Sequence, residues 1–513
     1  MRVTNNMITA NTKSNINANK VLVDKYNTQM TTQKKISRPS EDPVVAIRSL
    51  RMQTTLSHLT QYKDNNIADA NAWLDVTETA LTNMKKILTD IRTQCVNGST
   101  DTLTADDRQT ILKQLQSMSE QVYSEGNADY AGRTVFTGYR TSSQLTFKND
   151  ETDTTYSIKQ NFTYEDLQEH RYYYGETQVP SDAGTGNKCT TEVGTNTYQR
   201  LRLAYDDTES LDSFSYTAKG QTVKMETVSA ADAAAGADTA GKVVVYDTED
   251  DWYQATAKGT DGKTVGDDDV IFIKNTGEFV FGKEIAHAIS RDKAELNVSY
   301  TKTGFDAGEA RPEYYYDCTM KTPDMDEAVV YTKENQQIEF TISSGITFPA
   351  NTQASEVFDT SIGRDVNELI DIVTTAIKAN DKVSKIKSMM TQEQYADKDS
   401  QATLQGYLDS AQKEADYADD NLKKTYKQYI TNFDNYLDDV NNAITNIGSL
   451  QNRLDLAKTR VENQQMTVEQ LKTNNDDREI SDVIIDYYAS YNAYTSSLTA
   501  AAKVGKQTLL DYL

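Results

Sequence analysis

Apolar side chains recur at every seventh position over two long stretches of this chain, one in each half. The N-terminal stripe consists of Ile67, Leu74, Leu81, Leu88 and Cys95, beside a second stripe of Ala70, Thr77, Met84 and Ile91. The C-terminal stripe consists of Phe433, Val440, Ile447, Leu454, Val461 and Val468, beside Tyr436, Ala443, Leu450, Ala457, Gln464 and Leu471. A seven-residue period is typical of helices that wind around one another. We therefore expect the two arms to pack together as one long coiled-coil-like helical rod.

The sequence between the arms has a different character. Short runs rich in β-branched and aromatic residues, such as GKVVVYDT, VIFIKN, EFVFG, ELNVSYTK and QIEFTISSGITF, are separated by turn signals such as NTGE and ISSG. Such runs predict strands and hairpins. The expected fold class is therefore mainly α, with an inserted β-domain.

Two breaks divide the helical sequence further. The stretch SRPSEDPVVA, residues 37–46, contains two prolines, and TNNDDRE, residues 473–479, interrupts the long C-terminal pattern. A residue that precedes proline is kept out of the helical conformation, which also suits a helix N-cap. We therefore expect Asp42 to cap a helix that begins at Pro43, where the missing N–H costs nothing.

These breaks predict five segments. They are an N-terminal segment (1–42), an N-terminal helical arm (43–140), a β-rich insert (141–355), a C-terminal helical arm (356–472) and a C-terminal helix (473–513).

Both terminal segments carry apolar stripes that have little to pack against. The first contains Ile16, Val23, Tyr26 and Met30, and the last contains Ile484, Tyr488, Tyr491, Leu498 and Leu509, with Leu510 and Leu513 at its end. A lone amphipathic helix is marginal in water. We therefore expect these segments to become ordered when each packs on the other or on neighbouring molecules.

Charge and composition disfavour several classes of partner. The net charge is −24 and the mean hydropathy is −0.68, so neither nucleic acid nor an anionic membrane surface is an expected partner. No apolar run approaches the length of a membrane span, and the N-terminus MRVTNNMITA lacks the apolar core of a cleaved secretory signal.

Sequence patterns for catalysis and cofactors are absent. HExxH, GxSxG, Walker A and GxGxxG motifs do not occur, and the three cysteines form no CxxC pair. VGDDDV at 265–270 is interpreted as a solvated acidic turn rather than a calcium loop, because it lacks the alternate ligand spacing. RPEYYYDC at 311–318 is interpreted as packing tyrosines rather than a carbohydrate-stacking strip. We expect no enzyme activity, no metal and no cofactor.

Several motifs resemble the family of flagellar hook-associated protein 3, the FlgL-type junction proteins of the flagellin superfamily. TQKKISRPSEDPVVA is similar to that family's GKR-PSDDP motif, although TQKK replaces STGK and Glu41 replaces an aspartate. GRTVFTGYRT at 132–141 resembles its G-F-GY-T motif, and KQTLLDYL at the C-terminus resembles its SLLDYL tail. The resemblance covers both arms and is thin over the β-insert.

The resemblance implies a flagellin-like arrangement of the segments. Both termini would line an inner tube, the two arms would form an outer rod, and Arg38, Pro39, Ser40, Asp42 and Pro43 would form the elbow between them. It further implies an extracellular structural adaptor of the bacterial flagellum, exported without a cleaved signal peptide, that joins hook to filament by helix–helix packing. The implied partners are a ring of further copies, the other hook-associated junction protein, flagellin and an export chaperone.

Two alternatives stay open. The first is filament flagellin, which usually carries DDAAG where this chain has Pro39 and Pro43, and the prolines favour the junction protein. The other junction protein usually carries a NIANANTPGYSRQ-like stretch, which is absent here. The second alternative is an exported protein whose β-insert is an adhesin.

Overall fold

The computed structural model describes residues 5–100, 105–181, 189, 192–236, 238–256 and 263–504. These residues fall into two compact units. The first is drawn from residues 1–71, 339–348 and 451–513, and the second from residues 72–338 and 349–450.

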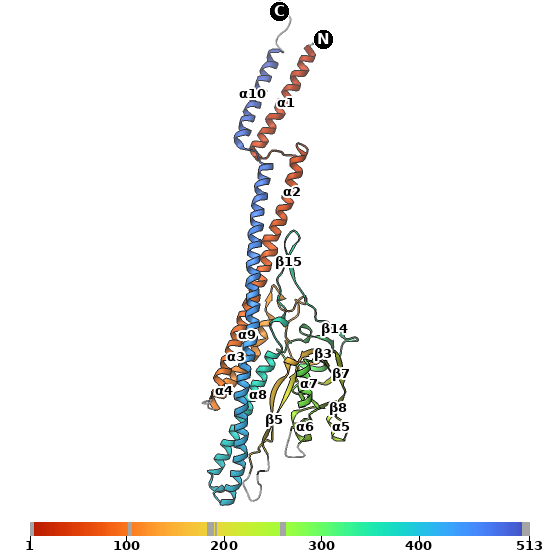
Figure 1. The fold of residues 1–513 in the computed structure, drawn as a ribbon. Coiled ribbons are helices and arrows are strands. Elements are labelled where there is room, and N and C mark those ends of the chain that lie inside the picture. Colours follow the sequence, from red (N-terminus) through yellow and green to blue (C-terminus); the bar gives the residue numbers. More distant parts are fainter. Residues whose placement is uncertain are drawn as a thin grey trace, which may run out of the picture. The chain divides into compact units, whose positions relative to one another are not determined.

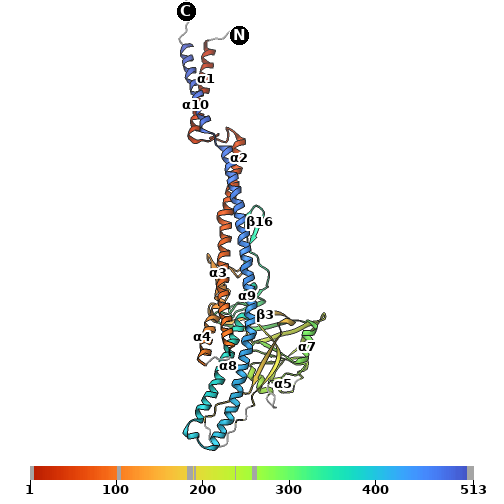
Figure 2. The same cartoon turned by 60° about the vertical axis from the view of Figure 1, so that its left-hand side comes forward.

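Paired helices make up most of the first unit. Helix α1 (Asn5–Thr32) runs antiparallel to α10 (Ile480–Val504), and α2 (Pro43–Thr60) runs antiparallel to the last part of α9 (Lys398–Asp476) (Figures 1 and 2). Apart from the buried Ala46, the buried or half-buried residues of α2 recur at alternating steps of four and three: Val45, Ser49, Met52, Leu56 and Leu59. This spacing keeps one face of α2 against α9.

A π-helical segment, η1 (Gln61–Ile67), connects α2 to α3 (Ala68–Gly98). If the spacing of α2 continued past Leu59, the next buried positions would be residues 63 and 66. The heptad that runs through α3 begins instead at Ile67. A π-helical turn accommodates one extra residue and so absorbs this difference. The sequence predicted an uninterrupted helix here, because a shift of one residue leaves the local helical pattern unchanged.

A β-hairpin lies against η1 in the first unit. Its strands are β15 (Glu339–Ser343) and β16 (Ile346–Pro349), as QIEFTISSGITF predicted. Asn66 Nδ2 donates a hydrogen bond to the carbonyl oxygen of Thr341 at 2.6 Å, and the Arg453 guanidinium lies 5.8 Å from the ring centre of Phe348. The hairpin is therefore held by these contacts to η1 and α9 and by the burial of Ile342 and Phe348.

The helices of the second unit bury the predicted stripes. They are α3, α4 (Ala105–Val122), α8 (Ser361–Met390) and the first part of α9. Every α3 stripe residue from Ala70 to Cys95 is fully buried, as are Phe433, Val440 and Ile447 on α9. Gly98 lies so close to α9 that a Cβ atom there would come within 2.3 Å of the Tyr426 ring. The predicted interior faces of these helices are thus confirmed.

Two details of α9 were wrong in the sequence analysis. The helix continues to Asp476, so the TNNDDRE break is confined to residues 477–479. Gln464 is exposed and Leu471 is half exposed, so the second stripe does not stay buried to the end of α9. The break is shorter because Asn and Asp residues tolerate the last turn of a helix as well as a loop.

Two six-stranded sheets form the inserted β-structure of the second unit, beside α8 and α9 (Figure 1). One has the order β4-β5-β11-β10-β9-β8 and the other β14-β13-β3-β12-β6-β7. The strands of the first are β4 (Gln168–Tyr174), β5 (Gly194–Arg202), β8 (Thr227–Ser229), β9 (Val243–Tyr246), β10 (Val270–Ile273) and β11 (Glu278–Phe281). Those of the second are β3 (Glu151–Thr163), β6 (Ser210–Ala218), β7 (Gln221–Met225), β12 (Glu295–Phe305), β13 (Asp317–Lys321) and β14 (Val329–Tyr331).

An apolar core joins the two sheets. Phe272, Phe279 and Phe281 from one sheet meet Phe214 and Tyr300 from the other, together with one face of α7 (Lys283–Asp292). Strand β3 was not predicted, because two of its buried positions, Thr154 and Gln160, are polar and weaken the apolar alternation that marks a strand. The fold class, mainly α with an inserted β-structure, is confirmed. None of the helices that the structure describes combines the length and apolarity of a membrane span.

Candidate assembly surfaces

The two predicted breaks lie side by side in the first unit and form one joint. Lys35 N donates a hydrogen bond to the carbonyl oxygen of Asp476 at 2.7 Å, and Arg478 N donates one to the carbonyl oxygen of Gln33 at 2.9 Å. Lys34 and Asp477 pair as an isolated antiparallel bridge, and their side chains form an ion pair. Segments far apart in the sequence are thus fastened at the point where both leave their helices.

Asp42 caps α2 as the sequence predicted. Its backbone is extended, and its Oδ1 accepts hydrogen bonds from Val44 N at 3.0 Å and Val45 N at 3.2 Å, with Pro43 as the first helical residue. The remaining predicted elbow residues, Arg38, Pro39 and Ser40, are exposed. The cap ends the loop and starts the rigid helix at a defined residue.

Two residues that the sequence analysis missed hold the joint together. Gln29 is buried at 4 % exposure, donates from Nε2 to the carbonyl oxygen of Lys35 at 2.6 Å, and accepts from Arg478 Nη1 at 2.9 Å. Arg478 also pairs with Asp486, and its guanidinium lies 5.5 Å from the ring centre of Tyr26. The only sequence signal for this role was that Arg478 is a lone arginine within the TNNDDRE break.

Helix α10 faces α1 with a stripe of mixed apolar and polar side chains. The residues on this face are Val483, Tyr487, Ser490, Tyr494, Ser497 and Ala501, of which only Val483 is fully buried. Asn19 Nδ2 donates a hydrogen bond to Ser497 Oγ at 2.7 Å. On α1 the predicted stripe residues Ile16, Val23, Tyr26 and Met30 are all half-buried, so this stripe is confirmed as the inner face of the terminal pair.

The stripe predicted on α10 lies beside that contact face rather than on it. Ile484, Tyr488, Tyr491 and Leu498 are 37 %, 61 %, 45 % and 42 % exposed. Each follows a contact-face residue by one position, so α1 does not cover it. Leu509, Leu510 and Leu513 lie outside the described residues. The pair of terminal helices therefore presents apolar side chains to solvent, which is typical of a surface that binds another molecule.

A buried ionic network joins the β-structure to the helices of the second unit. From β5, Arg202 Nη1 lies 2.6 Å from Glu368 Oε2 and Arg202 also pairs with Asp365, while Arg200 pairs with Glu368 at 2.7 Å. Asp365 Oδ2 accepts hydrogen bonds at 2.9 Å from Asn432 Nδ2 and Tyr436 OH. This network was not predicted from the sequence, since its arginines lie more than 160 residues from its carboxylates.

The network sets the charge states of its members. Burial alone would raise the pKa of Glu368, but the positive charges of Arg200 and Arg202 outweigh it and hold that pKa well below its usual range. Burial, helped by the charge of Arg200, lowers the pKa of the neighbouring His170 to about 3. At neutral pH the carboxylate is therefore charged and the imidazole neutral.

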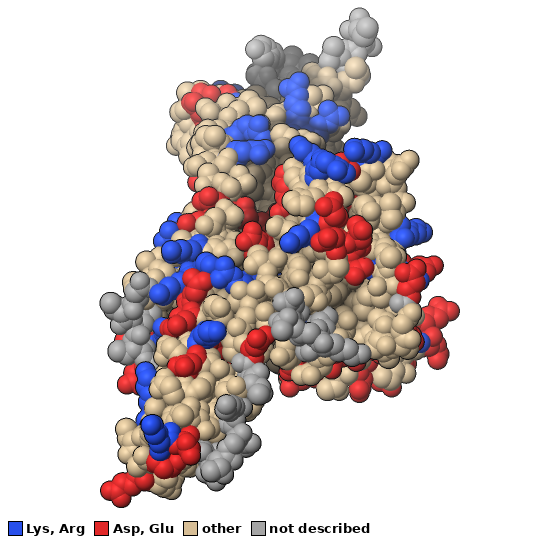
Figure 3. All heavy atoms as spheres, turned by 60° about the horizontal axis from the view of Figure 1, so that its bottom comes forward, with Lys and Arg blue, Asp and Glu red and all other residues tan. Residues whose placement is uncertain are grey.

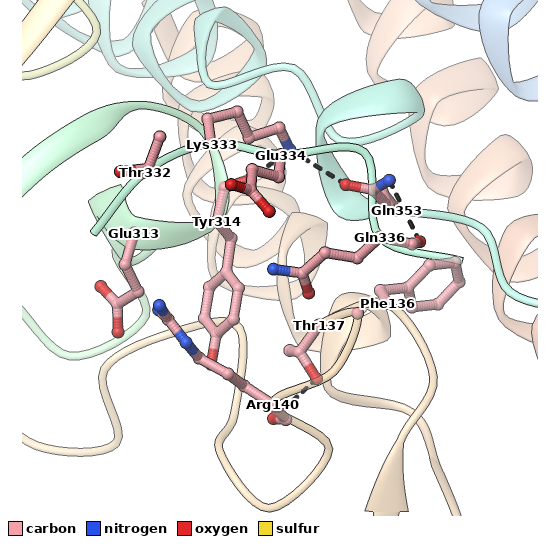
Figure 4. A pocket seen from close by; sticks show the side chains of 11 residues that line it. Phe136, Thr137, Arg140, Glu313, Tyr314, Thr332, Lys333, Glu334, Gln336 and Gln353 are labelled. Carbon is pink, nitrogen blue, oxygen red and sulfur yellow. Dashed lines mark hydrogen bonds between the residues drawn. The ribbon is translucent and has the colours of Figure 1, made fainter. Parts of the chain in front are cut away.

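The GRTVFTGYRT motif makes another contact between distant segments of the second unit. Phe136, Thr137, Gly138 and Arg140 line a cavity of about 20 Å³, together with residues of the 312–314 turn and the 332–336 segment (Figure 4). Tyr139 N donates a hydrogen bond to Gln336 Oε1 at 2.7 Å, and Gly138 has φ +62°, where a Cβ atom would collide with that oxygen. The cavity is large enough for a water molecule. The hydrogen bond from Tyr139 N holds the motif against the 332–336 segment.

Acidic and basic side chains are interspersed on the face shown in Figure 3. Among the described residues no group of three or more His, Cys, Asp or Glu side chains could hold a metal ion. The tyrosines Tyr314 and Tyr315 of RPEYYYDC are buried, so they pack in the interior, as the sequence analysis preferred.

Comparison with known proteins places these features in a family context. The model of the bacterial flagellin N-terminal helical region matches residues 3–141. Flagellar hook-associated protein 3 of Escherichia coli (strain K12) is 28% identical over 118 residues, which cover 23% of this chain and 37% of that protein. Its counterpart in Salmonella typhimurium is 26% identical over 142 residues, which cover 28% of this chain and 44% of that protein.

The matched region spans less than half the length of both relatives. A crystal structure of the flagellar junction protein FlgL from Legionella pneumophila aligns with 84% of this chain and 100% of its own, at 11% identity and a TM-score of 0.29. The resemblance to flagellar hook-associated protein 3 and to the flagellin superfamily, predicted from the motifs, is confirmed.

Proposed function

We propose that this protein is a structural adaptor of the bacterial flagellum that joins the hook to the filament. The relatives that it matches are flagellar hook-associated proteins, and it carries a flagellin N-terminal helical region. The observation that carries the proposal is the apolar stripe Ile484, Tyr488, Tyr491 and Leu498, which is left exposed although α1 and α10 already pair. A helix pair with a second apolar surface is suited to packing between subunits.

The proposed mechanism is non-catalytic and uses the five predicted segments. Residues 1–42 and 473–513 would line an inner tube, residues 43–140 and 356–472 would form the outer rod, and residues 141–355 would form the inserted domain. The joint around Asp42 and Arg478 would set the angle between tube and rod. Leu509, Leu510 and Leu513 would extend the apolar surface of the tube.

The proposed partners are further copies arranged in a ring, the other hook-associated junction protein, flagellin and an export chaperone. The location would be extracellular, on the flagellum. The net charge of −24 disfavours binding to the phosphate backbones of nucleic acids and to anionic lipid, which supports proteins as the partners.

Immunogold labelling of intact flagella tests the proposal. Antibodies against the insert should label a single narrow band at the boundary between hook and filament, and a strain that lacks the protein should show no band. Label along the whole filament would instead identify a filament flagellin and would overturn the proposal. Label absent from flagella but present on the cell surface would favour the adhesin alternative.

A further inference from the structure

The outer face of α2 exposes three apolar side chains on successive turns. Val44, Ile47 and Leu50 are 58 %, 52 % and 66 % exposed, and they lie on the side of α2 away from α9. Single exposed apolar residues are common on protein surfaces, but three together on one short helix are not needed for folding. This group, Val44, Ile47 and Leu50, is here named the α2 patch.

The α2 patch lies in a basic setting on an acidic chain. Helix α2 contains no aspartate or glutamate, and the exposed Arg48 and Arg51 flank the patch. Within the described part of the chain neither arginine forms an ion pair, although the whole chain has a net charge of −24. An apolar ridge beside two unpaired arginines is suited to an acidic amphipathic helix.

The first turns of α10 have the complementary character. Ile484, Ile485 and Tyr488 are exposed on this helix, and Glu479 and Asp482 lie exposed beside them. These two carboxylates form no ion pair with any described residue, whereas Asp486 is already paired with Arg478. The apolar side chains and unpaired carboxylates at the start of α10 therefore complement the apolar side chains and unpaired arginines of α2.

We infer that the α2 patch of one copy of this chain binds the first turns of α10 of a second copy. The inference rests on the proposed function, because it names the surfaces through which copies in a ring would meet. The two surfaces differ, so the contact is head-to-tail, and such a contact repeated with a constant rotation closes into a ring or continues as a helix. Arg48 and Arg51 would face Glu479 and Asp482 across it.

A charge-reversal experiment in the full-length protein tests this pairing. The variant Arg48→Glu/Arg51→Glu should be exported at the normal level and melt at the wild-type temperature, since both side chains are exposed, but cells should lose attached filaments. Adding Glu479→Lys/Asp482→Lys to the same chain should restore them, because every copy then carries both reversed surfaces. Lys224→Glu/Lys321→Glu, an equal charge change on exposed strand positions, is the matched control and should leave the filaments attached.

Either of two results would overturn the inference. Filaments that stay attached in the first variant would show that the α2 patch is not an interface, and filament loss that the second reversal fails to restore would show that its partner is not α10. Both results leave the labelling test of the proposed function untouched. A filament-wide label with successful charge rescue would conversely reject the junction role and keep the contact.

Disulfide trapping decides the question if the reversed proteins fail to fold. Leu50→Cys and Ile485→Cys, introduced together with Cys189→Ser, should give chains linked in multimers in isolated flagella after mild oxidation. A variant with only one of the two new cysteines should give no linked multimers beyond background, since the remaining native cysteines, Cys95 and Cys318, are buried. Monomers from the double-cysteine protein in attached, oxidised flagella would refute the proposed contact.

Discussion

Arg200 on β5 and Glu368 on α8 are joined by two hydrogen bonds from one guanidinium nitrogen, with Nη2 2.8 Å from Oε1 and 2.7 Å from Oε2. The Arg200 side chain is 5 % exposed and that of Glu368 17 % exposed, and Arg202 contacts the same carboxylate. An ion pair in such a place is costly to break, because either partner left alone is an uncompensated buried charge. The inserted β-structure is therefore fastened to the helices of its unit rather than merely attached at its ends.

Replacing Glu368 by glutamine should destabilise the second unit strongly. We expect a loss of about 3–5 kcal/mol in the free energy of unfolding, since two buried guanidinium groups would lose their shared carboxylate. Urea unfolding followed by the fluorescence of Trp73 and Trp252, both buried in this unit, measures it. The control is Asp420→Asn, which breaks a partly exposed pair with Arg171 and should cost less than about 1 kcal/mol. Equal losses in the two variants would contradict this account of burial.

The stability of the second unit should fall as the pH drops below the ordinary pKa of a histidine. His170 has a pKa of about 3 in the folded protein, so between its ordinary value near 6.5 and that pKa the unfolded chain binds the extra proton. Stability is then lost with falling pH, by up to about 2 kcal/mol between pH 6.5 and pH 5. The loss of stability that comes from Glu368 begins at a lower pH, below the ordinary pKa of a glutamate, because the pKa of Glu368 is depressed in the folded protein.

Comparing the wild type with His170→Gln isolates this contribution. The variant should show a flatter dependence of unfolding free energy on pH between 6.5 and 5, measured by urea titration at each pH. His287→Gln, at an exposed position on α7, is the control and should keep the wild-type slope. A His170→Gln slope equal to that of the wild type would show that this imidazole titrates normally in the folded state.

The helices were largely predictable because their determinants are local. The heptads from Ile67 to Cys95 and from Phe433 to Val461 mark interior faces directly, and the Asp42–Pro43 pair specifies where a helix starts. The π-helical turn was not predictable in the same way, since it shows only as a one-residue offset between two stripes. Leu471 was misassigned because α2, which still runs beside α9 at Lys472 and Asn475, does not cover the second stripe there.

The contacts between distant segments could not be read from the sequence. Nothing local to Gln29 or Arg478 indicates that they meet, and nothing near Arg202 indicates Asp365, because tertiary folding alone brings them together. The stripe on α10 shows a related limit. Tyr488 and Leu498 were correctly identified as apolar surface, but the sequence could not say that α1 would occupy the neighbouring face.

Deleting the inserted sheets should leave the helices folded but less stable. Removing residues 151–331 with a short flexible linker takes Arg200 and Arg202 away from Asp365 and Glu368. We expect retained helical far-UV circular dichroism with a lower melting temperature, because Asp365 stays beside Asn432 and Tyr436 of α9 without the positive charge that compensates it. A deletion that melts like the wild type would show that the insert is energetically independent of the helices. A deletion without helical signal would show that it belongs to their core.

Removing the α2 cap should loosen the joint locally. Asp42→Ala deletes the acceptor for Val44 N and Val45 N, at a cost of about 1 kcal/mol. Hydrogen exchange of the first turn of α2 should become faster, while exchange in α3 stays the same. Ser40→Ala, two residues away and exposed, is the control and should leave exchange unchanged. Unchanged protection in the Asp42 variant would mean that the joint, rather than the cap, fixes the start of α2.

The exposed stripe of α10 should matter for assembly and not for the monomer. In Tyr488→Ser/Leu498→Ser two exposed side chains become polar, so the melting temperature of the isolated protein should barely change. If neighbours bury these side chains, each lost one removes about 1.5–3 kcal/mol per subunit. We expect normal export, few attached filaments and flagellin shed unpolymerised into the medium, measured by electron microscopy and blotting of culture supernatants. Asn492→Ser, exposed on the same helix, should behave as the wild type. Normal filaments in the double variant would show that this stripe is not an assembly surface.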